Sequence, residues 1–178
     1  MSMARREKAG NMADKPKVLW RKDELDGRER AFTQRLNPDS LYHGAYMSRL
    51  AGMKRAHVTR VRLPPGKDSF AYHAHLVEEE WVYIISGTGV AEIDGEETTV
   101  GPGDFMGFAT PGVAHLLKNT SSEELVYLMG GESQPLEVLD YPKLGKRYLL
   151  MPGAKGVAFY ELKDPIMPFG RAPDEESR

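Results

Sequence analysis

Two histidines and three glutamates lie within the ten-residue segment YHAHLVEEEW, residues 72–81. Side chains at positions i and i+2 of a β-strand point to the same face, so His73 and His75 are expected to share one. Two imidazoles and a carboxylate form a donor set that suits divalent transition metals. A strand face turned to water would carry the same spacing, so the spacing leaves a metal site and an exposed strand as alternatives.

A third imidazole and a choice of carboxylates could complete such a site. His115 follows a Pro-Gly turn in PGVAHLLKN and opens another strand-like segment, which could lie beside the first. The alternation in EEEWVYIIS places Glu79 and Glu80 on opposite faces. Glu78 is the least favoured, because it lies furthest into the turn. The alternation does not choose between Glu79 and Glu80.

The segments that must position these residues are short and strand-like. HVTRVRL ends in a PPG turn, EWVYIIS is rich in β-branched and aromatic residues, and Asp94-Gly95 separates two alternating runs as in a β-hairpin. Further short runs follow up to Gly131, and no helix of useful length is expected between residues 57 and 131. This pattern is typical of an all-β antiparallel sandwich or barrel.

We divide the chain into four parts: a flexible N-terminal arm (1–17), an N-terminal extension that packs on the barrel (18–56), the β-barrel (57–131) and a C-terminal extension (132–178). Both extensions are expected to be largely irregular. A short helical turn is expected in RKDELDGRERAFTQRL, interrupted by Gly27 and Pro38, and a strand in KRYLLM. The segment DPIMPFGRAPDEESR is expected to lie over the surface or to fray.

Composition narrows the class of protein. The 178 residues carry a net charge of −2, which does not favour nucleic acid as a partner. The absence of cysteine excludes disulfides and thiolate metal sites. No apolar run approaches the roughly 18 residues that span a bilayer, so no membrane association is expected. We predict a cytoplasmic protein.

Residues 66–130 resemble the cupin superfamily. The first cupin motif reads Gly, five residues, His-x-His, three or four residues, Glu, six residues, Gly. This chain has Gly66, His73, His75, Glu80 and Gly87, with six residues instead of five in the first gap. The spacing to Gly87 selects Glu80 among the three glutamates.

The second cupin motif is matched in its last part. It reads Gly, five residues, Pro-x-Gly, two residues, His, three residues, Asn, and the chain has Gly112, His115 and Asn119 at the final positions. Pro111 abuts Gly112, and Gly103 lies too far upstream. This departure indicates a one-residue change in the turn before the histidine.

The resemblance implies a double-stranded β-helix (the jelly roll, or cupin barrel) with irregular N- and C-terminal extensions. It also implies one divalent metal ion, Mn, Fe, Zn or Ni, held by His73, His75, Glu80 and His115. Such a site leaves one or two coordination positions open, as a catalytic metal needs. The other histidines, His43 and His57, fit no motif position and are expected to be structural or exposed.

The fold and the metal do not define a reaction. The first hypothesis is an enzyme that acts on a small-molecule polar substrate, such as a sugar phosphate or sugar acid isomerase. The second is an Fe(II)-dependent dioxygenase. The third is a non-enzymatic ligand-binding cupin. An intact ligand set favours chemistry. No catalytic base is assigned, although Glu79, Tyr83 and His57 are candidates.

A phosphate group would need a cation, for which Arg60, Arg62 and Lys118 are candidates; each also suits a solvated outer face. Aromatic residues could line a pocket or fill the core: Tyr72, Trp81, Tyr83, Phe105, Phe108 and Tyr127. Small cupins commonly dimerise, and edge strands need cover, so a homodimer is predicted.

Overall fold

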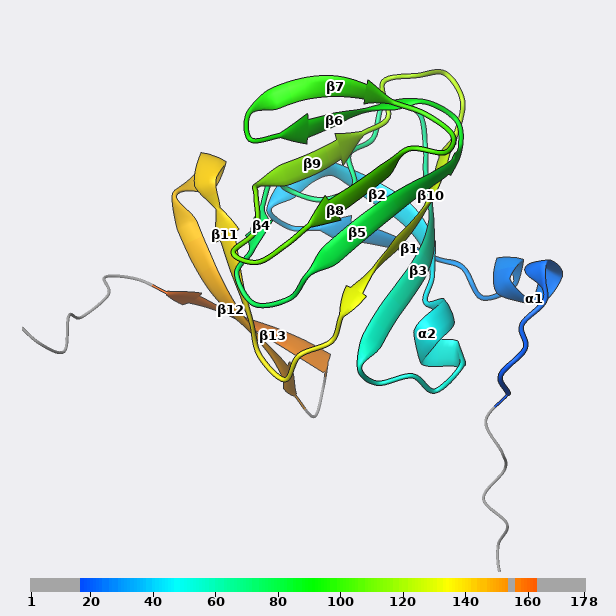
Figure 1. The fold of residues 1–178 in the computed structure, drawn as a ribbon, viewed down its shortest axis with the longest axis horizontal. Helices are drawn as coiled ribbons and strands as arrows, with labels where there is room; N and C mark the ends of the chain where they lie inside the picture. Colours follow the sequence, from blue (N-terminus) through cyan, green and yellow to red (C-terminus); the bar gives the residue numbers. More distant parts are fainter. Residues whose placement is uncertain (1–16, 154–155, 163–178) are drawn as a thin grey trace, which may run out of the picture.

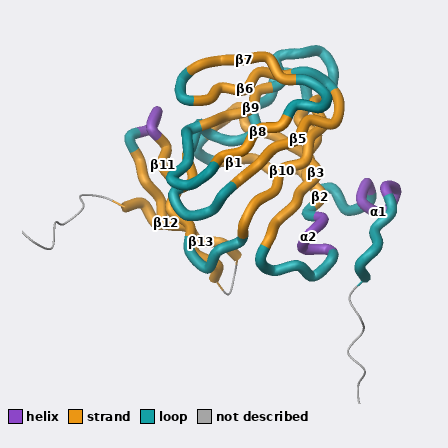
Figure 2. Tube along the Cα trace, in the orientation of Figure 1, coloured by secondary structure: helices purple, strands orange, loops and turns teal. Residues whose placement is uncertain are grey.

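The structure is a computed structural model that describes residues 17–153 and 156–162 (Figure 1). Strands connected by loops make up the body of the molecule (Figure 2), and the helices α1 (Lys22–Asp26) and α2 (Met47–Leu50) are short. The predicted N-terminal arm, apart from Lys17, and the segment DPIMPFGRAPDEESR lie outside the described residues.

Antiparallel strands form a large first sheet. Within the described residues, its spatial order is β1 (Arg30–Gln34), β2 (Asn37–Ala45), β3 (Ala56–Leu63), β10 (Leu125–Glu132), β5 (Glu80–Ser86) and β8 (Phe105–Phe108). In the middle of this sheet, Tyr127 lies opposite Val61 on one side and Ile84 on the other. The first sheet therefore combines the N-terminal extension with strands from the predicted barrel.

The other strands form two smaller sheets. One has the order β7 (Glu96–Val100), β6 (Gly89–Ile93) and β9 (His115–Lys118); the other has the order β13 (Gly156–Leu162), β12 (Lys146–Gly153), β11 (Glu137–Tyr141) and β4 (Ala74–His75). A backbone bridge joins them, because the His73 N–H donates to the His115 carbonyl (3.1 Å) and the His115 N–H donates to the His73 carbonyl (2.8 Å).

The main core lies on the inner face of the first sheet, where alternate residues of β3, β5 and β10 are buried. Val61, Leu63, Ile84, Leu125 and Tyr127 are at most 1% exposed. Burying each such side chain stabilises the fold by roughly 1.5–3 kcal/mol. The all-β, jelly-roll prediction is confirmed, and no helix interrupts the described residues between 57 and 131.

The predicted hairpin around Asp94-Gly95 is present between β6 and β7. Both turn residues have positive φ, 52° for Asp94 and 82° for Gly95. This combination is typical of a type I′ turn, whose twist matches that of the two strands. The Asp94-Gly95 pair therefore forms the hairpin turn that its residue types predicted.

The two extensions are more regular than expected. In the N-terminal extension, β1 and β2 join the first sheet beside β3. In the C-terminal extension, β11 pairs with β4 and with β12, which includes the predicted strand KRYLLM. The expectation of irregular structure was wrong for these strands, because an open sheet edge is satisfied by further strands. Pro38 is tolerated because it lies near the start of β2.

Candidate metal centre

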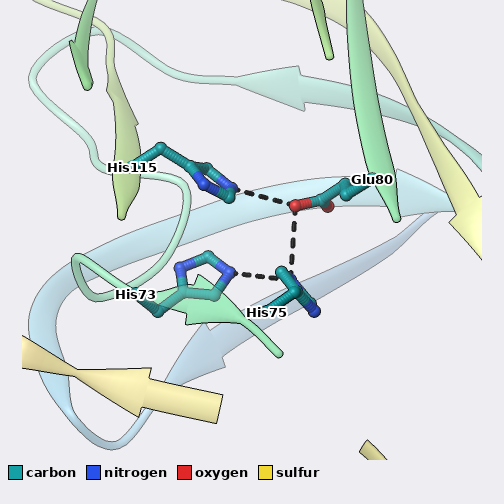
Figure 3. A group of neighbouring side chains, drawn as sticks. All are labelled: His73, His75, Glu80 and His115. Atoms are coloured by element: carbon teal, nitrogen blue, oxygen red, sulfur yellow. Dashed lines mark hydrogen bonds and ion pairs between the residues drawn. The ribbon is translucent and has the colours of Figure 1, made fainter. Parts of the chain in front are cut away.

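The four predicted ligands converge where the first sheet meets the two smaller sheets (Figure 3). His73 precedes β4 and His75 ends it, Glu80 begins β5, and His115 begins β9. One potential ligand atom from each residue lies within 4.8 Å of all the others. The His73–His115 backbone bridge explains how two segments about 40 residues apart in sequence bring their imidazoles together.

The contacts inside the cluster are short. The Nε2 atom of His115 lies 2.9 Å from Oε2 of Glu80, and the Nε2 atom of His75 lies 3.3 Å from the same oxygen. The Nε2 atoms of His73 and His75 are 3.2 Å apart. Three imidazole nitrogens and one carboxylate oxygen therefore face a common point.

Backbone carbonyls determine the tautomers of two imidazoles. Nδ1 of His73 lies 2.8 Å from the carbonyl oxygen of Ala71, and Nδ1 of His115 lies 3.0 Å from that of Val113. A carbonyl only accepts, so each Nδ1 must carry the proton and donate it. In the neutral rings, Nε2 is then left with its lone pair directed at the centre of the cluster, as metal coordination requires.

The environment of His73 keeps its ring neutral. Burial, together with the neighbouring His115 and His75, lowers the pKa of His73 from 6.5 to about 3. Burial disfavours the charged form because it removes the imidazolium from water, and neighbouring cations repel it. His73 thus presents a free lone pair over the whole physiological pH range.

Glu80 and His75 form the charged half of the cluster. Burial acts to raise the pKa of Glu80, but the contacts of its carboxylate with the imidazoles of His115 and His75 outweigh burial and hold the pKa well below its ordinary value. Burial opposes protonation of His75, yet Glu80, Glu137 and Glu78 raise the pKa of its ring. Without a metal, a proton on His75 would compensate the buried carboxylate of Glu80.

Aromatic rings pack against two of the imidazoles. The Phe108 ring stacks on His115, with a centroid separation of 3.7 Å and an interplanar angle of 7°. Tyr141 stacks on His73 at 6.0 Å, and Phe70 meets the same ring edge-on at 5.8 Å. These contacts restrict the ring orientations and exclude water from one side of the cluster.

The donor set fits a divalent metal ion. Metal–ligand bonds of about 2.1 Å place adjacent ligands about 3.0 Å apart in an octahedral site and about 3.4 Å apart in a tetrahedral one. Three of the separations between ligand atoms, 2.9, 3.2 and 3.3 Å, lie close to this range, and all of them are within 4.8 Å. Electron-rich atoms held so close need a shared proton or a cation between them.

Two motif residues that are not ligands support the site. The Gly112 N–H donates to the carbonyl oxygen of His75 at 2.6 Å, and a Cβ at this position would lie 2.6 Å from that oxygen, so only glycine fits. The buried amide of Asn119 donates to the carbonyl oxygens of Leu63 and Glu123, each at 2.7 Å. Gly112 thereby fastens β4, and Asn119 fastens the end of β9.

The neighbouring glutamates of Glu80 do not enter the cluster. Glu79 is exposed, and its backbone pairs with that of Glu132. The carboxylate of Glu78 accepts the N–H of Gln134 at 2.5 Å. Glu80, the residue that the motif spacing selects, is the buried member of the three, and its role as a ligand stays a prediction.

The three candidate cations for a phosphate group are engaged in ion pairs. Arg60 pairs with Asp26 and Glu29, and Arg62 pairs with Glu29 and Glu124. Lys118 pairs with Glu92 at 3.0 Å and with Glu97 at 2.6 Å. These contacts favour the alternative of a structural, partly solvated role for all three side chains.

Of the three candidate bases, only His57 lies on the inner face of the first sheet. Its Nδ1 lies 2.7 Å from the carbonyl oxygen of Glu132, and its backbone lies opposite Gly131, which also pairs with Glu80. Tyr83 is exposed on the outer face of β5, and Glu79 is exposed as well. Among the predicted pocket aromatics, Phe108 stacks on a candidate ligand, whereas Phe105 is exposed.

One further carboxylate near the cluster was not predicted. Glu137, from β11, is buried, and its Oε1 lies 3.8 Å from Nδ1 of His75. It forms a second possible metal-binding group with His75 and Glu78. No motif position or periodicity in the sequence pointed to Glu137, because only the pairing of β11 with β4 brings it there.

The family model described as the cupin domain matches residues 59–131. Together with the antiparallel sheets and the solved structures below, this match shows that the chain belongs to the cupin superfamily. A search of curated proteins gives no match. Among the described residues, no helix is long and apolar enough to cross a membrane.

Two solved structures resemble most of the chain. A presumptive sugar phosphate isomerase from Acidithiobacillus ferrooxidans is 28% identical, with a TM-score of 0.79 over 88% of this chain and 100% of that one. A cupin-superfamily sugar phosphate isomerase from Silicibacter pomeroyi is 25% identical, with a TM-score of 0.66 over 79% of this chain and 90% of that one.

A third structure shares the fold. A predicted oxalate decarboxylase from Thermotoga maritima is 23% identical, with a TM-score of 0.56 over 65% of this chain and 99% of that one.

Proposed function

We propose that the chain is a metal-dependent enzyme whose divalent ion is held by His73, His75, Glu80 and His115. The convergence of four ligand atoms within 4.8 Å carries this proposal. The contacts from Nδ1 of His73 and His115 to carbonyl oxygens support it, because they leave both Nε2 lone pairs directed inward.

The substrate class that we propose is a sugar phosphate or a related sugar acid, converted by isomerisation. The likeness to two proteins named as sugar phosphate isomerases, which extends over most of the chain, supports this class. When bound, the metal would polarise a substrate carbonyl. The protein contributes three oriented imidazoles, one carboxylate that balances positive charge, and aromatic packing that excludes water from one side.

Metal content is the decisive measurement for this proposal. Protein purified without chelator or immobilised nickel is expected to carry near-stoichiometric metal by mass spectrometry, and His75→Ala is expected to lose it. His43→Ala is the matched control, since His43 lies on β2 outside the cluster. A wild-type protein that is empty and takes up none of Mn, Fe, Zn or Ni would refute the metal site.

The identity of the metal separates isomerase from dioxygenase, because the same ligands hold Fe(II). Iron accompanied by substrate-dependent O₂ uptake would favour the dioxygenase. With another metal, incorporation of deuterium from D₂O into a sugar phosphate, followed by NMR, is expected for an isomerase that moves a proton through an enediolate. Bound metal without turnover of either kind would favour the ligand-binding cupin.

We also propose that the protein is a cytoplasmic homodimer. Tyr83 and Ile85 on β5 and Phe105 on the edge strand β8 are each more than 40% exposed, which favours a partner over this face. Light scattering coupled to size-exclusion chromatography is expected to give twice the 19.9 kDa mass of the chain. A monomer of 19.9 kDa would contradict the homodimer.

A further inference from the structure

Glu137 is a buried carboxylate whose oxygens accept consecutive backbone N–H groups. Oε1 accepts from Leu76 at 3.1 Å and from Val77 at 3.3 Å, and Oε2 accepts from Glu78 at 2.6 Å. The residue is 2% exposed. Three successive N–H groups that point at one anion form a backbone nest, which binds negative charge. A buried carboxylate with these bonds is stabilised where an unpaired one would be costly.

The N–H groups held by Glu137 belong to the loop that connects His75 to Glu80. The same loop is fastened to the end of β10, because the Glu132 N–H donates to the Glu79 carbonyl at 3.1 Å. The Leu76 N–H also donates to the carbonyl oxygen of Val138 at 3.0 Å. Two of the four candidate ligands therefore stand at the ends of a loop that the C-terminal extension holds in place.

The Nδ1 atom of His75 points towards the same carboxylate. It is buried, has no hydrogen-bond partner, and lies 3.8 Å from Oε1 of Glu137. When Nε2 of an imidazole binds a metal, Nδ1 carries the ring proton and needs an acceptor. A shift of about 1 Å would bring Nδ1 and Oε1 into hydrogen-bond distance.

His75 differs from the other two candidate histidine ligands in the acceptor that its Nδ1 atom faces. Nδ1 of His73 and Nδ1 of His115 donate to backbone carbonyls, which no substitution removes. The acceptor that faces Nδ1 of His75 is a side chain. Substitution of Glu137 therefore tests the support of one ligand while the other two imidazoles keep theirs.

We propose that Glu137 is a positioning residue for the metal site, which orients His75 and holds the loop that leads to Glu80. The inference rests on the proposed metal site and extends it to the C-terminal strand β11. Since β11 brings this carboxylate to β4, the cupin motifs alone would not complete the centre.

The test is a titration with Co²⁺, followed by the visible absorption that reports its ligand geometry. Glu137→Gln is expected to bind Co²⁺ about 10–100-fold more weakly than wild type. Its absorption bands at saturation are expected to shift, because His75 is no longer held in one orientation. Glu137→Asp retains the charge and is expected to recover part of the affinity. Asp140→Asn is the matched control, since Asp140 lies on the same strand but pairs with Arg147.

The outcomes separate the positioning role from the metal site. If wild type binds Co²⁺ and Glu137→Gln matches its affinity and spectrum, the positioning role is overturned while the metal site stands. A lower unfolding temperature with unchanged affinity and spectrum also overturns it, because it shows a purely structural role. If wild type binds no Co²⁺, both proposals fail.

A variant that does not fold needs a substitute. If Glu137→Gln fails to fold, Glu137→Asp carries the test, because its shorter side chain withdraws the carboxylate from His75. Weaker Co²⁺ binding with shifted bands supports the positioning role. Wild-type affinity with an unchanged spectrum in Glu137→Asp refutes it.

Discussion

The two halves of the candidate metal centre are held in different ways. His73 and His115 face each other across a backbone bridge, and their rings donate to carbonyl oxygens two residues earlier in the chain. His75 and Glu80 flank a loop whose conformation depends on a distant carboxylate, Glu137. The first half is held by backbone groups, whereas the second depends on the side chain of a distant strand.

The same division is visible in the electrostatics. The environment of His73 keeps its ring neutral, while the charges around His75 favour its protonated form. The half held by backbone groups thus offers lone pairs. The half held by the loop favours a proton on His75, whose positive charge a metal would replace. Substitutions that affect one half and not the other therefore test whether the two halves are held and charged differently.

The largest effect is expected at Gly112, where the two halves touch. In Gly112→Ala the added Cβ would lie 2.6 Å from the His75 carbonyl oxygen, so the backbone must move. We expect a loss of about 2 kcal/mol in the free energy of unfolding, within the range for overpacked sites, together with weaker metal binding. Urea unfolding and Co²⁺ titration measure the two effects.

Gly101→Ala is the control for that substitution, because the nearest atom to its added Cβ would be 3.9 Å away. Equal stability of the two alanine variants would show that the contact between Gly112 and β4 does not hold the halves together.

An intermediate effect is expected from pH in the metal-free protein. The pKa of His73 is about 3 in the fold and 6.5 ordinarily. Between these values the unfolded chain binds the extra proton. Stability from this residue is therefore present above pH 6.5 and falls with acidification, by roughly 1 kcal/mol between pH 6.5 and pH 5.5. His73→Gln is expected to remove that slope in urea unfolding.

His75 is expected to act in the opposite direction. Its pKa is raised in the fold, so its contribution is present below its ordinary pKa of 6.5 and is lost as pH rises through the folded value. His75→Gln is expected to remove this loss on the alkaline side. If both glutamine variants changed the pH profile in the same direction, the division between a neutral and a charged half would be wrong.

The smallest effect is expected at Lys118, which shares β9 with His115 but pairs with Glu92 and Glu97. Lys118→Gln removes partly exposed ion pairs and is expected to cost under about 1 kcal/mol of stability. Metal affinity is expected to stay within about twofold of wild type. A large loss of affinity, measured by Co²⁺ titration, would show that this ion-pair cluster belongs to the metal centre.

Local patterns predicted much of the central fold. The Asp94-Gly95 turn formed the expected hairpin because positive φ at both positions favours Asp and Gly. Alternation in EWVYIIS placed Val82 and Ile84 on one face and Tyr83 on the other, and the structure buries the first of these faces. Such features depend on residues that are close together in the chain, so the sequence alone can predict them.

The extensions were harder to predict, for a physical reason. The strands β1 and β11 are regular because they pair with β2, β4 and β12. Their own sequences have no strong period, and Gly27 and Pro38 suggested interruption. Pairing between segments distant in the chain supplies hydrogen bonds that local propensity does not predict.

By itself, the sequence determined that His73 and His75 would share one side of a strand, and that a third imidazole would begin another. The alternation left Glu79 and Glu80 open, and the cupin spacing selected Glu80. Only the tertiary structure decided that His115 would bond to His73 through the backbone and that Glu137 would lie beside His75. The reason is that the spacing of the ligands is a property of short segments of the sequence, whereas the groups that orient the ligands lie on strands that come together only in the folded chain.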